Sequence, residues 1–314
     1  MNSELRIRRH DSSRFILYSL FFILSAILYS LFVIRPAGAV SITPLTFDIT
    51  ADPGQVVSNR ITMFNTEPFP VGFTIEAEDF TAIGESGGVA IADNVPLELS
   101  AKNWLEFSPR SVVIEPGDSA DVAFTLRVPL DADAGGKYTS ILVSSVPGGV
   151  PGGSAIAQKI ASLLLIRVTG LVKEDLAVSS FEAPSFLENG PVLLTLRLQN
   201  NGTVHLRPAG FVFLQNWQGN EVHRIELPQE RVIPKTVRAI NLAWDEKWLF
   251  GKYTANLAGV YGSANEPISG SASFWVVPWK IAGLAALALL VILGFFVRAR
   301  HRVGMAFRIL FRGE

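Results

Sequence analysis

The sequence lacks cysteine entirely and has only four histidines in 314 residues. Without cysteine the chain can form no disulfide, no thiolate nucleophile and no cysteine-ligated zinc site. No His-x-x-x-His pair occurs either, so a zinc site has no evident ligands. We therefore predict no catalytic residue, no cofactor and no enzymatic activity, and we expect the fold to be stabilised by its hydrophobic cores alone.

Paired carboxylates leave some chemistry open. Asp131 and Asp133 are spaced as calcium ligands can be, and we keep them as weak calcium candidates, although Asp is also favoured in turns for its own backbone hydrogen bonds. Glu76 and Glu78 could serve a glycoside hydrolase, but they alternate with apolar residues on the solvent face of a predicted strand. A Ser-His-Asp arrangement also stays open.

Charge is distributed unevenly along the chain. The whole sequence has a formal charge of −1, but residues 40–279 hold 16 basic and 25 acidic residues. The two ends together hold 11 basic and 3 acidic residues. An acidic central part repels phosphate backbones, so we predict that the protein does not bind nucleic acid. Basic ends favour contact with a membrane.

A charge-free run near the C-terminus predicts a transmembrane helix over residues 278–298. The run from Ile281 to Val297 is about 17 residues long and would rise about 25 Å as a helix. Residues typical of membrane interfaces flank it: Trp275, Trp279 and Lys280 before it, Arg298 and Arg300 after it. We expect residues 299–314 to form a short basic tail in the cytoplasm.

The first 39 residues have the features of a signal peptide. A basic leader precedes an apolar run from Phe15 to Ile34, and Ala37-Gly38-Ala39 fits a cleavage site after Ala39. The apolar run is long for a signal peptide, so an uncleaved signal anchor is the alternative. Either way the central part lies outside the cytoplasmic membrane, and we predict a single-pass protein of that membrane with an extracytoplasmic ectodomain.

Strict alternation of apolar and polar residues predicts an all-β ectodomain. Asp121 to Val128, Phe73 to Glu78 and Val192 to Leu198 all alternate with a period of two, which is typical of strands with one buried face. Turn sequences rich in Gly, Pro and Asn separate these runs. Many short strands separated by such turns indicate antiparallel β-sandwiches of immunoglobulin-like type.

A short internal repeat predicts two tandem sandwiches. Gly136-Lys137-Tyr138-Thr139 recurs as Gly251-Lys252-Tyr253-Thr254, and Asn65 and Asn200 each close an alternating strand upstream. A Gly-x-Tyr before a late strand is typical of a tyrosine corner, in which the hydroxyl returns to nearby backbone. We therefore assign Tyr138 and Tyr253 to the fold.

The boundary between the sandwiches is predicted near a short polar crossing at residues 173–175. This places the first sandwich at residues 40–172 and the second at residues 173–277. Within the first, the Gly- and Pro-rich segment 147–154 lacks the Lys-Ser/Thr ending of a phosphate-binding loop, and we predict a mobile hairpin tip.

Tryptophans of the second half are the candidates for partner binding. Trp244 continues the alternation of Ile240 and Leu242, so we predict that it packs in the core. Trp217 lies at a predicted hairpin end and Trp248 in a predicted loop. Exposed tryptophans on a sandwich can bind sugar rings or form protein hot spots, and packing in the core or at an edge is the alternative. We retain Trp217 and Trp248 as partner-binding candidates.

Turn residues carry a resemblance to known families. In the first half they are Thr43-Pro44, Asp52-Pro53-Gly54, Asn65-Thr66, Trp104-Leu105, residues 113–117, Val128-Pro129 and Gly136. In the second half they are Asn200 to His205, Pro208-Ala209-Gly210 and Gly219-Asn220. With the order of signal segment, two β-domains, membrane helix and basic tail, the chain resembles the WxL-interacting cell-surface proteins of bacteria. In that family the first domain is described as peptidoglycan-binding and the second as host-protein-binding. The first half also resembles the immunoglobulin-like domain of fimbrial chaperones.

The resemblance implies a cell-wall polysaccharide or another surface protein as partner, but its motifs are turn residues and assign no individual binding residue. We therefore predict a membrane-anchored cell-surface protein that binds or scaffolds extracellular partners. An accessory subunit of a secretion or pilus machine is the alternative, and a cell-wall hydrolase is a weaker one.

Overall fold

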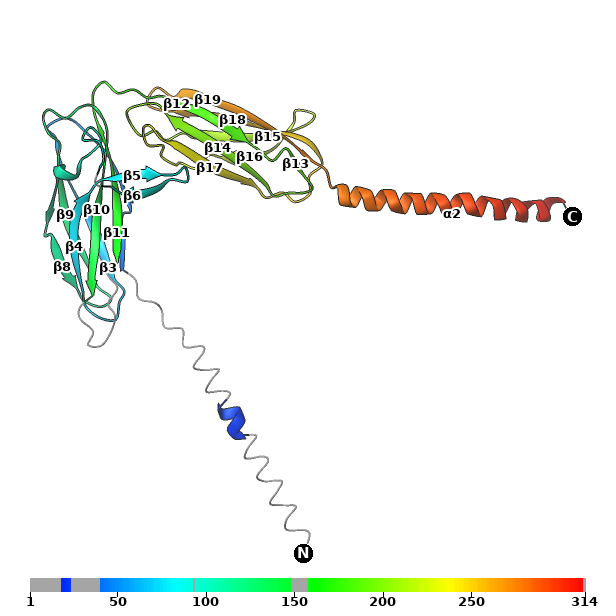
Figure 1. The fold of residues 1–314 in the computed structure, drawn as a ribbon, viewed down its shortest axis with the longest axis horizontal. Helices are drawn as coiled ribbons and strands as arrows, with labels where there is room; N and C mark the ends of the chain where they lie inside the picture. The colour runs from blue at the N-terminus through cyan, green and yellow to red at the C-terminus, as the bar shows by residue number, and fades with distance from the viewer. Residues whose placement is uncertain (1–17, 24–39, 93, 148–157, 313–314) are drawn as a thin grey trace, which may run out of the picture.

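The computed structural model describes residues 18–23, 40–92, 94–147 and 158–312, and the side chains of α2 as far as Arg298. Most of the predicted signal peptide lies outside these residues, and only its helical part from Tyr18 to Ile23 is described. Residues 148–157, which include most of the predicted hairpin tip, also lie outside them. The rest confirms the predicted class, since it consists of β-sandwiches followed by one long apolar helix (Figure 1).

Two sheets form the first sandwich, and all but one of their strand pairs are antiparallel. One has the strand order β1 (Val40–Thr43), β3 (Val56–Asn65), β9 (Ser119–Arg127), β7 (Leu105–Ser108). The other has the order β2 (Thr46–Ala51), β11 (Lys159–Val168), β10 (Gly135–Pro147), β4 (Val71–Glu78), β8 (Ser111–Ile114), with β2 parallel to β11. A short 3-10 helix, Lys102–Trp104, precedes β7.

A proline separates the strands at two of the points where the chain changes sheets in this sandwich. Pro44 separates β1 from β2, and Pro109 separates β7 from β8. Proline lacks a backbone N–H and cannot continue a ladder, so it suits the point at which a strand leaves one sheet for the other. The second of these crossings leaves β7 and β8 as edges of opposite sheets, which matters for the site described below.

The second sandwich pairs a three-stranded sheet with a five-stranded one. The first has the order β12 (Leu176–Glu182), β14 (Val192–Asn200), β17 (Val237–Trp244). The second has the order β13 (Phe186–Leu187), β19 (Glu266–Val276), β18 (Gly251–Tyr261), β15 (Ala209–Asn216), β16 (Glu221–Glu226). The strands of the two sandwiches lie within residues 40–168 and 176–276, while the exact domain boundaries remain predictions.

Each sandwich has its own hydrophobic core, as the alternation indicates. The inward side chains of β14, from Val192 to Leu198 at every second residue, are all fully buried, and those of β9 are almost as inaccessible. Trp244 is 5% exposed and packs edge-on against Tyr253, which confirms its predicted place in the core.

The internal repeat is only half confirmed. The hydroxyl of Tyr253 donates to the carbonyl of Phe250 at 3.2 Å, as a tyrosine corner requires. Tyr138, by contrast, lies on the outer face of its sheet, and its hydroxyl approaches Nδ1 of His205 in the other sandwich at 3.4 Å. The prediction that both hydroxyls return to nearby backbone is therefore wrong for Tyr138, because the second sandwich covers this residue.

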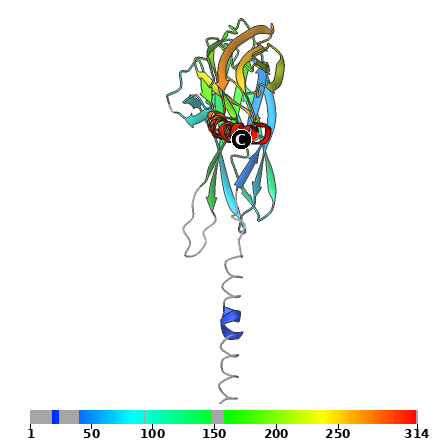
Figure 2. The same ribbon diagram turned by 90° about the vertical axis from the view of Figure 1, so that its right-hand side faces the viewer.

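The two sandwiches meet at an angle. In Figure 1 the strands of the second sandwich run in the direction of the C-terminal helix, whereas those of the first run across it, as Figure 2 also shows. A hairpin of β5 (Phe80–Ile83) and β6 (Gly88–Ile91) extends from the first sandwich to the second, where the N–H of Ala239 in β17 donates to the carbonyl of Glu85 at 2.8 Å. The hairpin therefore contacts both sandwiches and helps to fix the angle between them.

Helix α2 (Trp279–Arg312) follows β19 after two residues. Its segment from Trp279 to Arg298 is 20 residues long, has a mean hydropathy of 2.5 and is not buried at all by the rest of the chain. By length and composition it is the candidate membrane span within the described residues.

Candidate functional site

Neighbouring free edges of the two sheets line an open groove in the first sandwich. Strand β8 pairs with β4 only as far as Ser111 opposite Thr74, and the N–H of Ile75 then donates to the carbonyl of Arg110 at 2.9 Å. From Glu76 to Glu78, β4 has no described strand beside it on this side. Among the described strands β7 pairs with β9 alone, so its outer edge also has no described strand beside it.

The groove has a volume of about 650 Å³. Side chains from β4, the 3-10 helix and β7 line it, with both signs of charge among them: Glu76, Lys102, Glu106 and Arg110. Nζ of Lys102 lies 3.8 Å from a carboxylate oxygen of Glu78, so Glu78 partly neutralises the positive charge of Lys102. Because alternate residues of a strand direct their backbone groups to opposite neighbours, Ala77 directs its N–H and carbonyl into the groove, as Ile75 does. An extended polypeptide could pair with this edge.

A polar cluster joins the sandwiches on the opposite edge of the same sheet. Asp48 of β2 accepts hydrogen bonds from Arg231 Nε at 2.9 Å and from Arg207 at 3.2 Å. His205 Nε2 lies 3.1 Å from the other oxygen of Asp48. We call Asp48, His205, Arg207 and Arg231 the junction cluster. One carboxylate of the first sandwich thus gathers three basic side chains of the second.

The junction cluster changes the protonation of its carboxylate. The hydrogen bond with His205, followed by that with Arg231, lowers the pKa of Asp48 far below its usual value, although partial burial acts in the opposite direction. Asp48 is therefore ionised throughout the physiological range. Burial raises the pKa of the Tyr138 hydroxyl, which stays protonated and can donate to Nδ1 of His205. The histidine is bonded at both ring nitrogens and is held in place.

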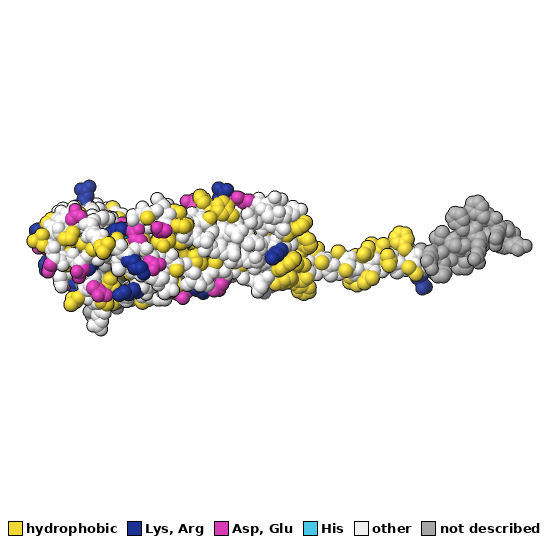
Figure 3. All heavy atoms as spheres, turned by 90° about the horizontal axis from the view of Figure 1, so that it is seen from above, with side chains coloured by type: hydrophobic (Ala, Val, Ile, Leu, Met, Phe, Trp, Pro, Cys, Tyr) yellow, Lys and Arg dark blue, Asp and Glu magenta, His cyan; other side chains and the backbone are white. Residues whose placement is uncertain are grey.

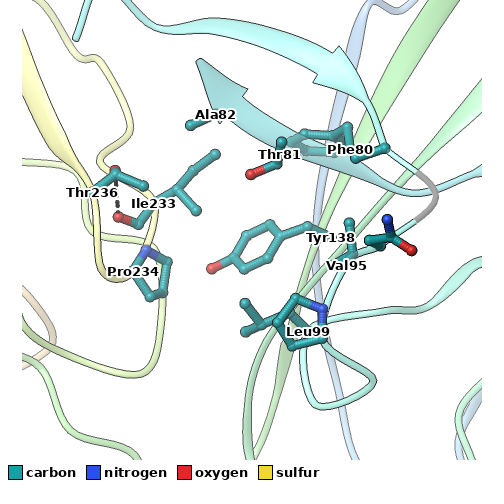
Figure 4. A pocket seen from close by; sticks show the side chains of 12 residues that line it. Phe80, Thr81, Ala82, Val95, Leu99, Tyr138, Ile233, Pro234 and Thr236 are labelled. Carbon is teal, nitrogen blue, oxygen red and sulfur yellow. Dashed lines mark hydrogen bonds between the residues drawn. The ribbon is translucent and has the colours of Figure 1, made fainter. Parts of the chain in front are cut away.

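Beside Tyr138 the junction encloses a small cavity of about 130 Å³ (Figure 4). The hairpin strand β5 supplies Phe80 and Thr81, and the second sandwich supplies Ile233, Pro234 and Thr236. In Figure 4 the ring of Tyr138 points across the cavity toward Pro234. Since the lining is mostly apolar and the volume is that of a few water molecules, the cavity marks imperfect packing between the sandwiches better than a ligand site.

Further ion pairs fix the two sandwiches to each other. Arg197 of β14 binds Glu85 of the hairpin at 2.7 Å, which joins the sandwiches, and Glu182 of β12 in its own sandwich at 2.7 Å. Both bonds raise the pKa of the guanidinium. Glu174 lies in the crossing and pairs with Arg167 at 2.6 Å while accepting hydrogen bonds from Ser263. Burial acts to raise the pKa of Glu174, but the bonds from Ser263 and Arg167 outweigh it and the pKa is lowered.

The sequence-predicted acidic candidates do not converge. Asp131 and Asp133 are exposed in the connection from β9 to β10, and within the described ranges no group of three or more His, Asp or Glu side chains is placed to hold a metal. The calcium hypothesis stays a prediction. Glu76 is exposed, as the alternation indicates, whereas Glu78 is half-buried beside Lys102.

The aromatic candidates are exposed and lie far from the groove. Trp217 follows β15 in a turn and Trp248 lies between β17 and β18, and each is 70% exposed. Trp275 lies in β19, Trp279 and Lys280 begin α2, and Arg298 ends its apolar segment, while the side chain of Arg300 lies outside the described part. Their place at a membrane interface stays a prediction. Partner binding by Trp217 and Trp248 stays a prediction.

The turn between β5 and β6 contains a Gly-x-Ser-x-Gly motif. Gly84-Glu85-Ser86-Gly87-Gly88 has the Gly-x-Ser-x-Gly spacing of a nucleophile elbow. An elbow requires a strand, a sharp turn and then a helix, but these residues form the turn between β5 and β6. The side chain of Arg238 also packs against Gly87. The segment therefore has a structural role at the junction.

No family model matches the sequence, and no curated protein matches it. Solved structures with a similar fold include the class 5 fimbriae chaperone CfaA, at 12% identity and a TM-score of 0.39, covering 71% of this chain and 98% of that one. The SafB chaperone, solved in complex with the Salmonella enterica SafA pilin, has 11% identity and a TM-score of 0.38 over 77% and 98%. The E. coli chaperone DraB has 11% identity and a TM-score of 0.36 over 76% and 98%. The similarity is one of fold, to chaperones of the fimbrial type, and no family model supports membership of the WxL-interacting family.

Proposed function

We propose that the protein is a membrane-anchored, extracytoplasmic binding protein that receives an extended segment of a protein partner in the groove between β4 and β7. The observation that carries this proposal is the pair of free sheet edges that line one groove. An exposed edge offers unpaired N–H and C=O groups in a fixed spacing, and extended peptides bind such edges by adding a strand. No turnover is part of this function.

The membrane anchor would be α2. Its 20-residue apolar segment rises about 30 Å, which matches the hydrocarbon core of a bilayer. Arg298 and the basic residues after it favour a cytoplasmic C-terminus, which places both sandwiches outside. The first sandwich is then the one remote from the bilayer, since the second is joined directly to α2 (Figure 1).

The chemistry of the groove fits a polypeptide partner better than a glycan. Backbone groups of β4 and charges of both signs can bind a main chain and its side chains. A cell-wall polysaccharide, the other partner predicted from sequence, is usually bound through exposed aromatic rings, and the tryptophans with the largest exposure lie at the other end of the ectodomain. The accessory-subunit alternative is a narrower form of our proposal, in which the partner is a secreted subunit.

Proline at position 77 provides the test, because it removes the N–H that Ala77 directs into the groove while the neighbouring residues keep the ladder to β10. A photo-crosslinking amino acid at exposed Asn103, in the full chain in its native membrane, would form an adduct with a bound polypeptide. We expect Ala77→Pro to abolish that adduct. The matched control is Val222→Pro, at the irregularity of the edge strand β16 in the second sandwich, which should preserve it.

Four outcomes would contradict the proposal. An adduct that persists in Ala77→Pro, or one lost equally in Val222→Pro, would exclude the β4 edge as the binding site. If the protein co-sediments with purified cell wall and forms no polypeptide adduct, the partner is a glycan. Release of soluble fragments from the cell wall would instead indicate the hydrolase.

A further inference from the structure

Exposed aromatic side chains gather at the end of the second sandwich from which α2 leaves, where Figure 3 shows a concentration of hydrophobic atoms. We call these residues the aromatic collar, and they are between 51% and 73% exposed: Phe186, Trp217, Trp248, Phe250, Trp275 and Trp279. They come from four separate segments of the chain. Single exposed apolar residues are normal on a protein surface, but six large aromatic residues at one end are not.

Strand register explains why these segments share one end. Val276, the last residue of β19, pairs with Gly251, the first of β18, and Trp275 pairs with Phe186 of β13. Asn216, the last residue of β15, lies opposite Tyr253 near the same end of β18, so the turn that carries Trp217 follows there. A Cβ atom on Gly251 would lie 3.4 Å from Cδ1 of Trp217. Phe250 directly precedes Gly251, and Trp248 lies two residues before Phe250.

The connection between β19 and α2 is short, and hydrogen bonds and an ion pair hold the residues around it. The N–H of Val277 donates to the carbonyl of Leu187 at 2.9 Å, and Nζ of Lys280 lies 2.7 Å from Glu188 at the end of β13. The N–H of Ala282 donates to the carbonyl of Pro278 at 2.9 Å. With no flexible linker, α2 continues the long direction of the second sandwich (Figure 1), so the aromatic collar faces the plane at which the helix would enter a bilayer.

The composition of the aromatic collar matches a membrane interface. Indole rings are favoured at the headgroup level because they combine an apolar body with one polar N–H. The same end carries Asp245, Glu246 and Lys247 side by side, so it has no excess of basic residues that would attract anionic lipid. Any attraction to a bilayer must therefore come from the aromatic rings.

We propose that the aromatic collar inserts into the interfacial layer of the phospholipid bilayer that α2 spans and holds the second sandwich against the membrane. The inference rests on the proposed anchor. It assigns Trp217 and Trp248 to lipid and not to a protein or glycan partner, and it leaves the groove of the first sandwich as the surface that remains free. Interfacial insertion of this kind reaches about 5–10 Å into the headgroup region.

The absence of cysteine makes a direct test simple, since a single introduced cysteine can carry a spin label. The full chain would be reconstituted in phosphatidylcholine vesicles and labelled at one of three positions. Gln218→Cys reports on the turn beside Trp217, Ala264→Cys on the opposite end of the same sandwich, and Ala286→Cys on the middle of α2. Accessibility to oxygen, which concentrates in lipid, is compared with accessibility to a water-soluble nickel chelate.

We expect the ratio of oxygen to nickel accessibility at position 218 to lie above that at 264 and below that at 286. In a Trp217→Ser, Trp248→Ser variant the ratio at 218 should fall to the value at 264, while the ratio at 286 stays unchanged. Because the attraction is not ionic, 1 M salt should leave all three ratios unchanged. If the ratio at position 218 is as low as that at 264 while the ratio at 286 is that of a site in lipid, the inference is wrong but α2 still spans the bilayer. An aqueous ratio at 286 would overturn the anchor itself.

Discussion

Replacing Asn200 by alanine is expected to lower the free energy of unfolding of the second sandwich by about 3 kcal/mol. The side chain is fully buried at the end of β14. Its Nδ2 donates to the carbonyls of Val204 at 2.9 Å and Val232 at 2.7 Å, and its Oδ1 accepts from the N–H of Gly202 at 2.9 Å. Alanine would leave these three backbone groups without partners, at about 1 kcal/mol or more each.

The first sandwich contains an equivalent buried asparagine. Asn65 is fully buried at the end of β3, its Nδ2 donates to the carbonyls of Phe69 at 2.9 Å and Ile114 at 2.8 Å, and its Oδ1 accepts from the N–H of Glu67 at 2.9 Å. Asn65→Ala should therefore destabilise the first sandwich by a similar amount. The equivalence of these two asparagines is firmer support for an internal duplication than the repeated Gly-Lys-Tyr-Thr tetrapeptide.

Hydrogen exchange of the full chain in detergent, resolved by peptide, would measure both losses without assuming that the two sandwiches unfold together. The control is Asn241→Ala, whose exposed amide oxygen accepts a single hydrogen bond from Thr195 at 3.2 Å. That control should change stability by less than about 0.5 kcal/mol. A loss below about 1 kcal/mol for Asn200→Ala would show that the three bonds are replaced by water.

The strands of both cores could be predicted because burial on one face imposes a period of two on the sequence. Every second residue from Val192 to Leu198 is inaccessible, and the same holds along β9. The pattern needs only local information, since each residue's face is fixed by its neighbours in the strand. The apolar helix was equally predictable, because a bilayer requires a long charge-free run.

The junction could not be predicted, because its residues are distant in sequence. Asp48 lies between two buried residues of β2 and has the pattern of a solvent-facing side chain. Nothing near it indicates that Arg231, 183 residues away, would bind it. Tyr138 and Tyr253 show the same dependence on distant residues. They occupy the same position in a repeated tetrapeptide, but their hydroxyls have different partners because the second sandwich packs over Tyr138.

The groove was missed for a related reason. Alternation shows that Glu76 faces solvent, but it does not show which neighbour a strand has. That β8 begins opposite Thr74, and so leaves the rest of β4 uncovered, follows from the crossing of the chain at Pro109. The Ser-Pro dipeptide that begins this crossing was the available signal, since a proline within an apolar run demotes a strand to an edge.

Replacing Asp48 by alanine is expected to loosen the angle between the sandwiches. It would leave two guanidinium groups and His205 without the carboxylate that gathers them. Because the Asp48 side chain is about one third exposed, we expect a loss of about 1–2 kcal/mol, less than for a fully buried ion pair. Each sandwich has a separate core, so the loss should fall on the junction and not on either fold.

The distribution of distances between spin labels on the two sandwiches measures this directly. With single cysteines replacing exposed Val113 and Ala264 in the full chain, pulsed electron resonance should give a narrow distribution for the native junction and a broader one for Asp48→Ala. Asp48→Asn keeps the shape of the side chain but not its charge, and should lie between them. The control is Asp121→Ala, since the described partners of Asp121 lie in its own sandwich, Thr62 at 2.6 Å and Arg60 at 3.8 Å.

Acid should reproduce the effect of the substitution. The folded-state pKa of Asp48 is lowered, so its stabilising contribution is complete above the ordinary aspartate pKa of about 3.9 and is lost as the pH falls below that value toward the lowered pKa. The native distribution should thus stay narrow from pH 7 to about pH 4 and broaden only in stronger acid, whereas that of Asp48→Ala should already be broad at pH 7. If Asp48→Ala keeps the native width at pH 7, the hairpin β5–β6 and the Arg197 pairs alone set the angle, and the junction cluster does not.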